Sequence, residues 1–280
     1  MESRSAGRGL VHCRGVGHRA LAPMHNPPER QSAGASRGSL EACGPDFRNP
    51  FIGLVDRHVG RYAWKEQDAV IDRRGSRPTT VYLVRHGESQ LNLEKRVSGH
   101  LDTLLSPTGI RHSHMLAEQL REVRFTGIYT STLKRTIETA GPTAATHGLP
   151  IQSDAALNEM HFGVLEGRFR DVRDPEALTL WEARKQDKRF HRIPGAERFI
   201  DMAERVKKAL TNILAQESSG ILLIVGHRNT NRVLFGMLMQ QPEEEWPHVH
   251  LKIQYVYRIT TGSHPNLSTI ALSCKQTVLV

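Results

Sequence analysis

The chain is 280 residues long, carries a formal net charge of +9 and contains 38% hydrophobic residues. This length allows one large domain or two small ones. No stretch approaches the ~18 consecutive apolar residues that a membrane span needs. The three cysteines have no CxxC spacing and the 15 histidines include no HExxH motif, so no metal site is indicated. We therefore expect a cytoplasmic protein without a membrane partner.

Residues 1–78 differ in composition from the rest of the chain. They hold 13 Lys and Arg against 8 Asp and Glu, six of the 14 prolines and few periodic apolar residues. This composition predicts a basic, disordered extension. Its arginines are scattered singly without interleaved aromatic residues, so we expect no nucleic acid to bind it. A misassigned start codon, which would place much of this segment outside the natural protein, is an alternative that the sequence leaves open.

Residues 79–280 alternate strand and helix signals, which predicts an α/β domain of three layers, α/β/α, with a mainly parallel sheet. Strands are predicted at 81–84, 127–131, 151–152 and 221–225, helices at 106–122, 133–147, 201–217 and 228–239, and two antiparallel strands at 255–259 and 267–272. The charge-rich stretch at about 160–195 predicts a helical cap inserted into this domain.

The tetrapeptide Arg85-His86-Gly87-Glu88 directly follows the apolar run 81–84. Such a run before a glycine predicts a buried strand that ends in a tight turn. The turn would present His86 and Arg85 side by side at the end of the strand, where open α/β sheets build their sites. A neutral imidazole beside a guanidinium suits attack on a phosphoryl group whose oxygens the arginine holds.

Three further residues follow other predicted strands. His227 comes after the strand 221–225, Arg135 lies one turn into the helix that follows 127–131, and Glu159 comes shortly after the edge strand. Parallel strands would bring all of these side chains to one edge of the sheet. Two arginines and two histidines around one point make an anion pocket, for which a phosphate dianion is the best-matched occupant. Glu159 would be a carboxyl group able to protonate a leaving oxygen.

The order of these motifs resembles the histidine phosphatase superfamily, the phosphoglycerate-mutase-like group. The resemblance covers about residues 79–272 and rests on 85–89 with Asn92, 131–136 with 138–140, Glu159 and 226–227, together with 98–102, 105–109 and 194–197. Because these motifs occur in order and at suitable spacing, the match is far more specific than the first motif alone.

The resemblance implies a role for each site residue. His86 would accept the phosphoryl group on a ring nitrogen, and Glu159 would protonate the leaving alcohol and then activate water. The phosphoryl oxygens would be held by Arg85, Asn92, Arg135 and His227. Ser98 and Gly99 would contact the substrate, or would form only a turn. Because arginines and histidines supply the positive charge, no metal or cofactor is expected.

Within this family the phosphatase branch is the better match. The segment 159–167 is similar to that branch, and the stretch before Pro194 is short for the lid of a mutase. We therefore expect hydrolysis of a small phosphomonoester through a phosphohistidine, without a metal. A phosphoglycerate-type mutase and a non-catalytic protein that binds a phosphorylated ligand are the alternatives. The sequence leaves open whether the chain forms a homodimer.

Two features outside the phosphate pocket have open interpretations. Basic residues of the insertion favour a substrate with a second anionic group, or form a solvated helix face: Arg184, Lys185, Lys188, Arg189, His191 and Arg192. Glu197 belongs to the site, or is a carboxylate that stabilises the start of a helix. In the segment 195–198, alanine and arginine stand where the family commonly has glycine and serine.

Overall fold

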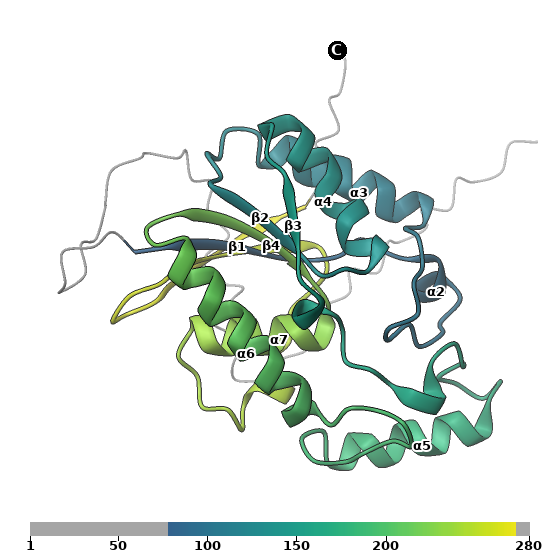
Figure 1. Cartoon of the computed structure of the whole chain (residues 1–280). Coiled ribbons are helices and arrows are strands. Elements are labelled where there is room, and N and C mark those ends of the chain that lie inside the picture. The colour runs from purple at the N-terminus through teal and green to yellow at the C-terminus, as the bar shows by residue number, and fades with distance from the viewer. Residues whose placement is uncertain (1–77, 273–280) are drawn as a thin grey trace, which may run out of the picture. The chain divides into compact units, whose positions relative to one another are not determined.

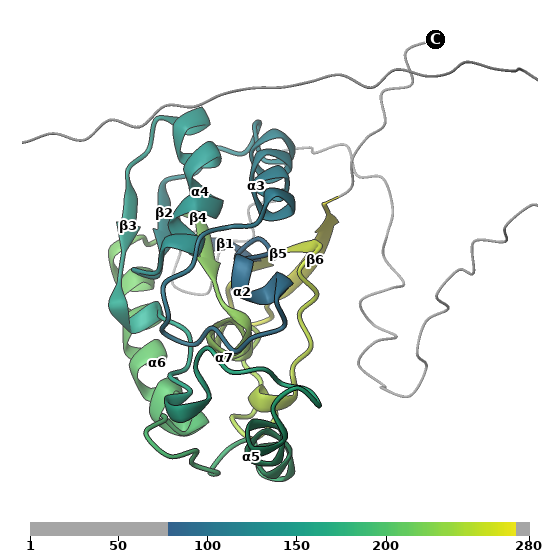
Figure 2. The ribbon, with the colours of Figure 1, turned by 90° about the vertical axis from the view of Figure 1, so that its right-hand side faces the viewer.

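A computed structural model describes residues 78–272, so the predicted N-terminal extension lies outside the described residues, except for Pro78. The described part is built on a six-stranded sheet with the strand order β3-β2-β4-β1-β5-β6. Figure 2 shows the strands in this order, from β3 at one edge to β6 at the other. No helix of the described residues is both long enough and apolar enough to cross a membrane.

Four of the strands are parallel. They are β1 (Thr80–Arg85), β2 (Gly127–Thr130), β3 (Ile151–Ser153) and β4 (Ile221–Gly226). The antiparallel strands β5 (Tyr255–Thr260) and β6 (Asn266–Ala271) extend the sheet beyond β1. β1 and β4 are almost wholly buried, which is typical of central strands covered on both faces. The predicted mainly parallel α/β sheet is therefore confirmed.

Helices cover both faces of the sheet (Figure 1). One face carries α3 (Pro107–Gln119) and α4 (Lys134–His147), and the other carries α6 (Phe199–Gln216) and α7 (Arg228–Leu238). The Ser106 side chain caps α3 by accepting a hydrogen bond from the Gly109 N–H. On α6, apolar residues at helical spacing from Met202 to Ile213 face the sheet. These two apolar layers, one on each side of the sheet, form the core.

Two further helices lie on the side where the parallel strands end. Figure 1 shows α2 (Gln90–Leu93) and α5 (Pro175–Gln186) on that side. The stretch predicted as a helical cap contains α5 and a 3₁₀ turn at Gly163–Leu165. Phe162 packs against Trp181 of α5, with ring centroids 5.5 Å apart. This contact ties α5 to the segment that follows Glu159.

Candidate active site

The ends of β1 and β4 place two histidines beside each other. Arg85 pairs with Gly226 in the parallel register, and the N–H of His86 donates to the Gly226 carbonyl over 2.9 Å. His86 and His227 therefore leave neighbouring strands at the same level. Their ring centroids are 5.1 Å apart, and the two residues are 3% and 0% exposed.

Local contacts fix the ring of His86. Its Nδ1 lies 2.7 Å from the carbonyl oxygen of Gly87, which requires the proton to be on Nδ1 and leaves the Nε2 lone pair free. Burial holds the pKa of His86 well below its usual value, and the charges of Arg135 and Arg85 add to this effect. The ring is therefore neutral at pH 7. A side chain at Gly87 would meet the backbone of Gly109, so the turn needs a glycine.

Two guanidinium groups lie beside these rings. Burial lowers the pKa of Arg85 to about 10, and the carboxylate of Glu159 opposes this shift. Arg135, at the start of α4, is 1% exposed. It donates from Nη1 to the Leu101 carbonyl over 2.9 Å and from Nη2 to the Gly99 carbonyl over 2.7 Å. Arg135 thus holds the 99–101 loop against the site.

Several hydrogen-bond donors of this cluster have no protein acceptor. Among the residues that the structure describes, Nε of Arg85, Nε of Arg135 and Nδ1 of His227 are buried without a hydrogen-bond partner. His227 is held from its other side, where Nε2 lies 2.8 Å from Oγ of Ser131. Buried polar groups are normally satisfied, so a concentration of unpaired donors, two of them on guanidinium groups, marks a place for an anion.

Glu159 is 8% exposed, and its carboxylate lies at the N-terminus of α7. It accepts hydrogen bonds from the backbone N–H of Met160 over 2.8 Å and from the N–H of Asn229 over 3.2 Å. Asn229 directly follows Arg228, the first residue of α7. The Glu159 charge raises the pKa of both Arg85 and Arg135 against the effect of burial. The structure thus brings Glu159 to the same cluster as the strand-end residues.

Asn92, Ser98 and Gly99 lie in the segment between β1 and α3, with different contacts. The Oδ1 of Asn92 accepts from the N–H of Ser89 over 3.4 Å, in a capping box that begins α2. Ser98 has a buried hydroxyl without a partner among the described residues. Gly99 has φ of +50°, and a side chain there would meet the carboxylate of Glu166. Packing and backbone conformation therefore account for Gly99, and the observed contacts of Asn92 are those of a helix cap.

A sequence profile of the histidine phosphatase superfamily (branch 1) matches residues 81–268. These residues include the whole strand-end cluster. The chain belongs to the histidine phosphatase superfamily. The resemblance expected from the ordered motifs is confirmed.

Known members of the superfamily resemble the chain in sequence and in fold. A 6-phosphofructo-2-kinase/fructose-2,6-bisphosphatase of Gallus gallus is 34% identical over 188 residues, which are 65% of this chain and 37% of the relative. The chain thus spans little more than a third of that relative. An alpha-ribazole phosphatase from Shigella flexneri has a TM-score of 0.63 at 27% identity, covering 69% of this chain and 96% of that one. YhfR of Bacillus stearothermophilus has a TM-score of 0.62 at 28% identity, and the match covers 68% of this chain and 95% of that one.

These comparisons confirm the histidine phosphatase family and the phosphoglycerate-mutase-like fold. Among the described residues, no group of three or more His, Cys, Asp or Glu side chains is arranged to hold a metal ion. In the described cluster, positive charge comes from the guanidinium groups and hydrogen-bond donors already described.

A second group of basic residues borders this histidine phosphatase site. Arg184 of α5 is 5% exposed, and its guanidinium lies 5.4 Å from the Phe162 ring centroid. Arg232 of α7 is 6% exposed, and burial lowers its pKa to about 10, with Arg228 adding to the shift. Lys188 also has a lowered pKa because of burial and then the charges of its basic neighbours, Arg232, Arg184, Arg228 and Lys185. We call Arg184, Lys188, Arg228 and Arg232 the basic rim.

Of the basic rim, only Arg184 and Lys188 could be identified from the composition of the insertion. Arg228 and Arg232 are four residues apart directly after His227, which places them on one face of α7, so their spacing was an available signal. Other basic residues of the insertion are engaged elsewhere. Lys185 pairs with Glu182 at 2.6 Å, and Arg192 pairs with Asp201 at 3.0 Å.

Proposed function

We propose that the chain hydrolyses a phosphomonoester through a phosphohistidine formed on Nε2 of His86. The observation that carries this proposal is the state of that ring. It is buried and neutral, its Nδ1 is held by the Gly87 carbonyl, and unpaired donors of Arg85, Arg135 and His227 surround it. A neutral imidazole with one fixed nitrogen is a nucleophile, and the unpaired donors match phosphoryl oxygens.

The reaction would proceed in two displacements. In the first, Nε2 of His86 attacks phosphorus, the P–O bond to the alcohol breaks, and the carboxyl group of Glu159 gives its proton to the leaving oxygen. In the second, Glu159 takes a proton from water, the water oxygen attacks phosphorus, and the P–N bond breaks. Inorganic phosphate leaves, and His86 and Glu159 return to their starting states.

The basic rim supports a substrate with a second anionic group. Grouping four cationic side chains, of which Arg184 and Arg232 are buried, raises the free energy of the empty site, and an anion would relieve this repulsion. The Gallus gallus relative carries the name of a bisphosphatase. We therefore propose a sugar bisphosphate, or a phosphorylated acid, as the substrate class. The sequence has only three cysteines and no CxxC pair, which supports the reducing cytoplasm as the place of action.

The proposed function is tested by phosphate release from a panel of esters at pH 5.5–7.5 with a metal chelator present. The panel contains 4-nitrophenyl phosphate, glycerol phosphate, ribazole phosphate and fructose 2,6-bisphosphate. We expect chelator-resistant release, with the doubly anionic ester giving the highest kcat/KM. A rapid quench in alkaline detergent with radiolabelled substrate traps the phosphoenzyme, and the acid lability and base stability of the label identify a phosphohistidine.

The matched control is His86→Ala, beside His114→Ala, which changes an exposed residue of α3. Loss of both release and label in His86→Ala only would support the proposal. A labelled His86 that transfers its phosphoryl group to an added hydroxy acid faster than to water would support the mutase instead. Binding of phosphate without label or release would indicate a non-catalytic protein.

A further inference from the structure

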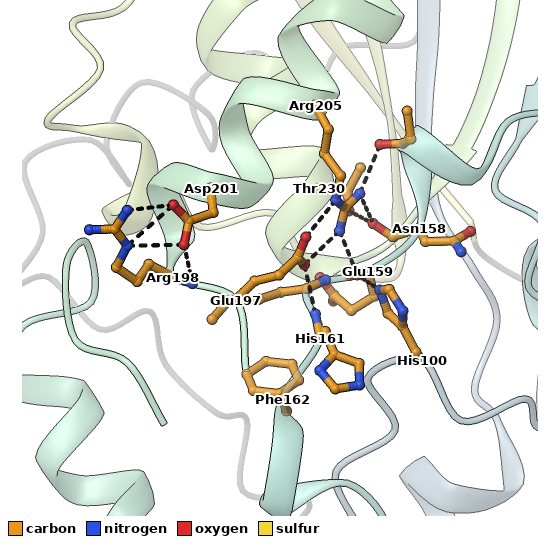
Figure 3. Close-up of polar contacts among 12 residues, drawn as sticks. His100, Asn158, Glu159, His161, Phe162, Glu197, Arg198, Asp201, Arg205 and Thr230 are labelled. Carbon is orange, nitrogen blue, oxygen red and sulfur yellow. Dashed lines mark hydrogen bonds and ion pairs between the residues drawn. The ribbon is translucent and has the colours of Figure 1, made fainter. Parts of the chain in front are cut away.

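Arg205 of α6 uses every N–H of its guanidinium in a hydrogen bond within one small region (Figure 3). Its Nε donates to Glu197 over 2.8 Å. Its Nη1 donates to the carbonyl oxygens of Ala156 and Asn158, both over 2.8 Å. Its Nη2 donates to the carbonyl of Glu159 over 2.9 Å and to Glu197 over 2.8 Å. A guanidinium has five N–H donors in a rigid plane, so these five hydrogen bonds use all of the donors of Arg205.

Three of these five bonds end on the backbone that carries Glu159. Two other elements hold the same backbone from different sides. Nε2 of His100 lies 2.6 Å from the Glu159 carbonyl, and Oγ1 of Thr230 donates to the Asn158 carbonyl over 2.9 Å. The peptide groups on each side of the Glu159 Cα are thereby fixed in orientation. The side-chain direction of Glu159 depends on that orientation.

Glu197 connects Arg205 to the residues that follow Glu159. It accepts the N–H of His161 over 2.9 Å, and its own N–H donates to the His161 carbonyl over 3.1 Å. Burial acts to raise the pKa of Glu197, but the hydrogen bonds from Arg205 and His161 bring it below its usual value. The carboxylate at the start of α6 that caps the helix is instead Asp201, which accepts from the N–H of Arg198 over 3.1 Å.

We propose that Arg205 and Glu197 are positioning residues that hold the carboxyl group of Glu159 where it meets the leaving oxygen. This inference rests on the proposed role of Glu159 as general acid. The pair holds the backbone at 156–161 by hydrogen bonds from the α6 side. The N–H groups of Met160 and Asn229 donate hydrogen bonds to the carboxylate itself. Neither Arg205 nor Glu197 needs to touch the substrate for this role.

The test is a ratio of two kcat/KM values, for glycerol phosphate and for 4-nitrophenyl phosphate. The alkoxide of glycerol needs a proton to leave, whereas 4-nitrophenolate leaves without one, so only the first substrate depends on an aligned acid. A change that merely lowers the fraction of folded enzyme affects both values equally and cancels in the ratio. We expect Arg205→Lys and Glu197→Gln to lower the ratio about tenfold, because misplacement of a catalytic group by a fraction of an ångström costs this order.

The matched control is Arg198→Met, which breaks an ion pair of 2.6 Å between the N-cap residue of α6 and Asp201. In the described structure the Arg198 side chain makes no hydrogen bond or ion pair with residues 156–161. We expect the ratio of Arg198→Met to equal that of the wild type. Glu159→Gln, measured in parallel, gives the full effect of losing the acid. Arg205→Met removes all five donors and is measured at a temperature below its own melting midpoint. If it does not fold, Arg205→Lys and Glu197→Gln decide alone.

The outcomes separate this inference from the function on which it rests. A lowered ratio in Glu159→Gln, Arg205→Lys and Glu197→Gln, but not in Arg198→Met, supports the positioning role. A lowered ratio in Glu159→Gln alone overturns it and leaves the general acid in place. An unchanged ratio in Glu159→Gln overturns the acid role itself, and the positioning role with it.

Discussion

The imidazole rings of His86 and His227 lie with their centroids 5.1 Å apart, and each ring is buried at the end of a parallel strand. Both pKa values are held well below the usual range, first by burial and then by Arg135 and, for His227, by His86 itself. Two adjacent neutral rings can take different roles in phosphoryl transfer, one as the nucleophile and the other as a hydrogen-bond donor. Nε2 of His86 is free for attack, while Nδ1 of His227 has no acceptor among the described residues.

The first prediction concerns the pH dependence of the reaction. A protonated His86 cannot attack phosphorus, and its lowered pKa keeps it neutral below pH 6.5. We expect kcat/KM for 4-nitrophenyl phosphate, corrected for ionisation of the ester, to show no acidic limb near pH 6.5. The independent check is an NMR titration of the histidine ring signals, assigned with His86→Asn. A His86 signal that titrates with a midpoint near 6.5 would contradict the prediction.

The second prediction concerns stability. Below pH 6.5 the unfolded chain takes up protons on His86 and His227, while the folded chain does not, so folding loses stability as the pH falls. Each ring contributes up to about 1.4 kcal/mol per pH unit in that window. We expect the urea midpoint to fall between pH 6.5 and 5 in the wild type and to fall less in His86→Asn. Changing the exposed His114 to Asn should leave the pH dependence as in the wild type.

The third prediction concerns Ser131, whose Oγ lies 2.8 Å from Nε2 of His227 and also accepts the N–H of Leu133 over 3.2 Å. When the hydroxyl donates to Nε2, the proton of His227 sits on Nδ1 and points to the anion site. Ser131→Ala removes this control, and we expect kcat/KM to fall about tenfold. Ser113→Ala, a buried serine of α3 that donates to the Ile110 carbonyl, is the matched control and should retain wild-type kcat/KM.

Strand and helix order could be predicted because periodicity and parallel topology constrain it strongly. The ends of β1 and β4 placed Arg85, His86 and His227 together, as the sequence indicates. Helix ends were less accurate. α3 stops at Gln119 rather than at 122, where the chain continues in a turn. α6 starts at Phe199 rather than at 201, since its N-cap is an arginine, which is not a recognised capping signal.

The placement of Glu159 depends on contacts that no local pattern contains. Its carboxylate is held by the N–H of Asn229, 70 residues away, and its backbone by Arg205. The sequence therefore indicated a carboxylate near the site but not what fixes it. The role of Glu197 could not be predicted either, and the sequence left two interpretations open. Its partner Arg205 lies two turns along α6. Ion-pair partners at such separations are decided by the packed structure.

The fourth prediction concerns Gly99. Its φ of +50° disfavours other residues, and an added Cβ would meet the carboxylate of Glu166, which accepts the N–H groups of His100 and Phe162. Gly99→Ala should displace the loop whose carbonyl Arg135 holds. We expect about 1–3 kcal/mol lower stability in urea and about tenfold lower kcat/KM. Gly141→Ala on α4, where an added Cβ meets nothing within 4 Å, should leave kcat/KM unchanged and should not lower stability, because alanine is the better helix former.

The last prediction compares two lysines of the α5 region, Lys188, which belongs to the basic rim, and Lys185, which does not. The Nζ of Lys188 lies 3.5 Å from Nδ1 of His248, and its pKa is lowered by burial and then by Arg232 and Arg184. Lys185 is exposed and pairs with Glu182. Lys188→Met should lower kcat/KM about tenfold for a doubly anionic ester relative to 4-nitrophenyl phosphate, because one charge-assisted contact is lost.

Lys185→Met removes the same charge from the same segment, but its ammonium is already engaged with a carboxylate on the solvent side of α5. We expect its ratio of the two kcat/KM values to match the wild type. The comparison also distinguishes a specific contact from long-range attraction. A long-range electrostatic attraction of the substrate would weaken equally in both variants. It would also disappear as the salt concentration rises, because salt ions screen it. If both variants lower the ratio to the same extent, the basic rim steers anions toward the site and does not bind the second anionic group of the substrate.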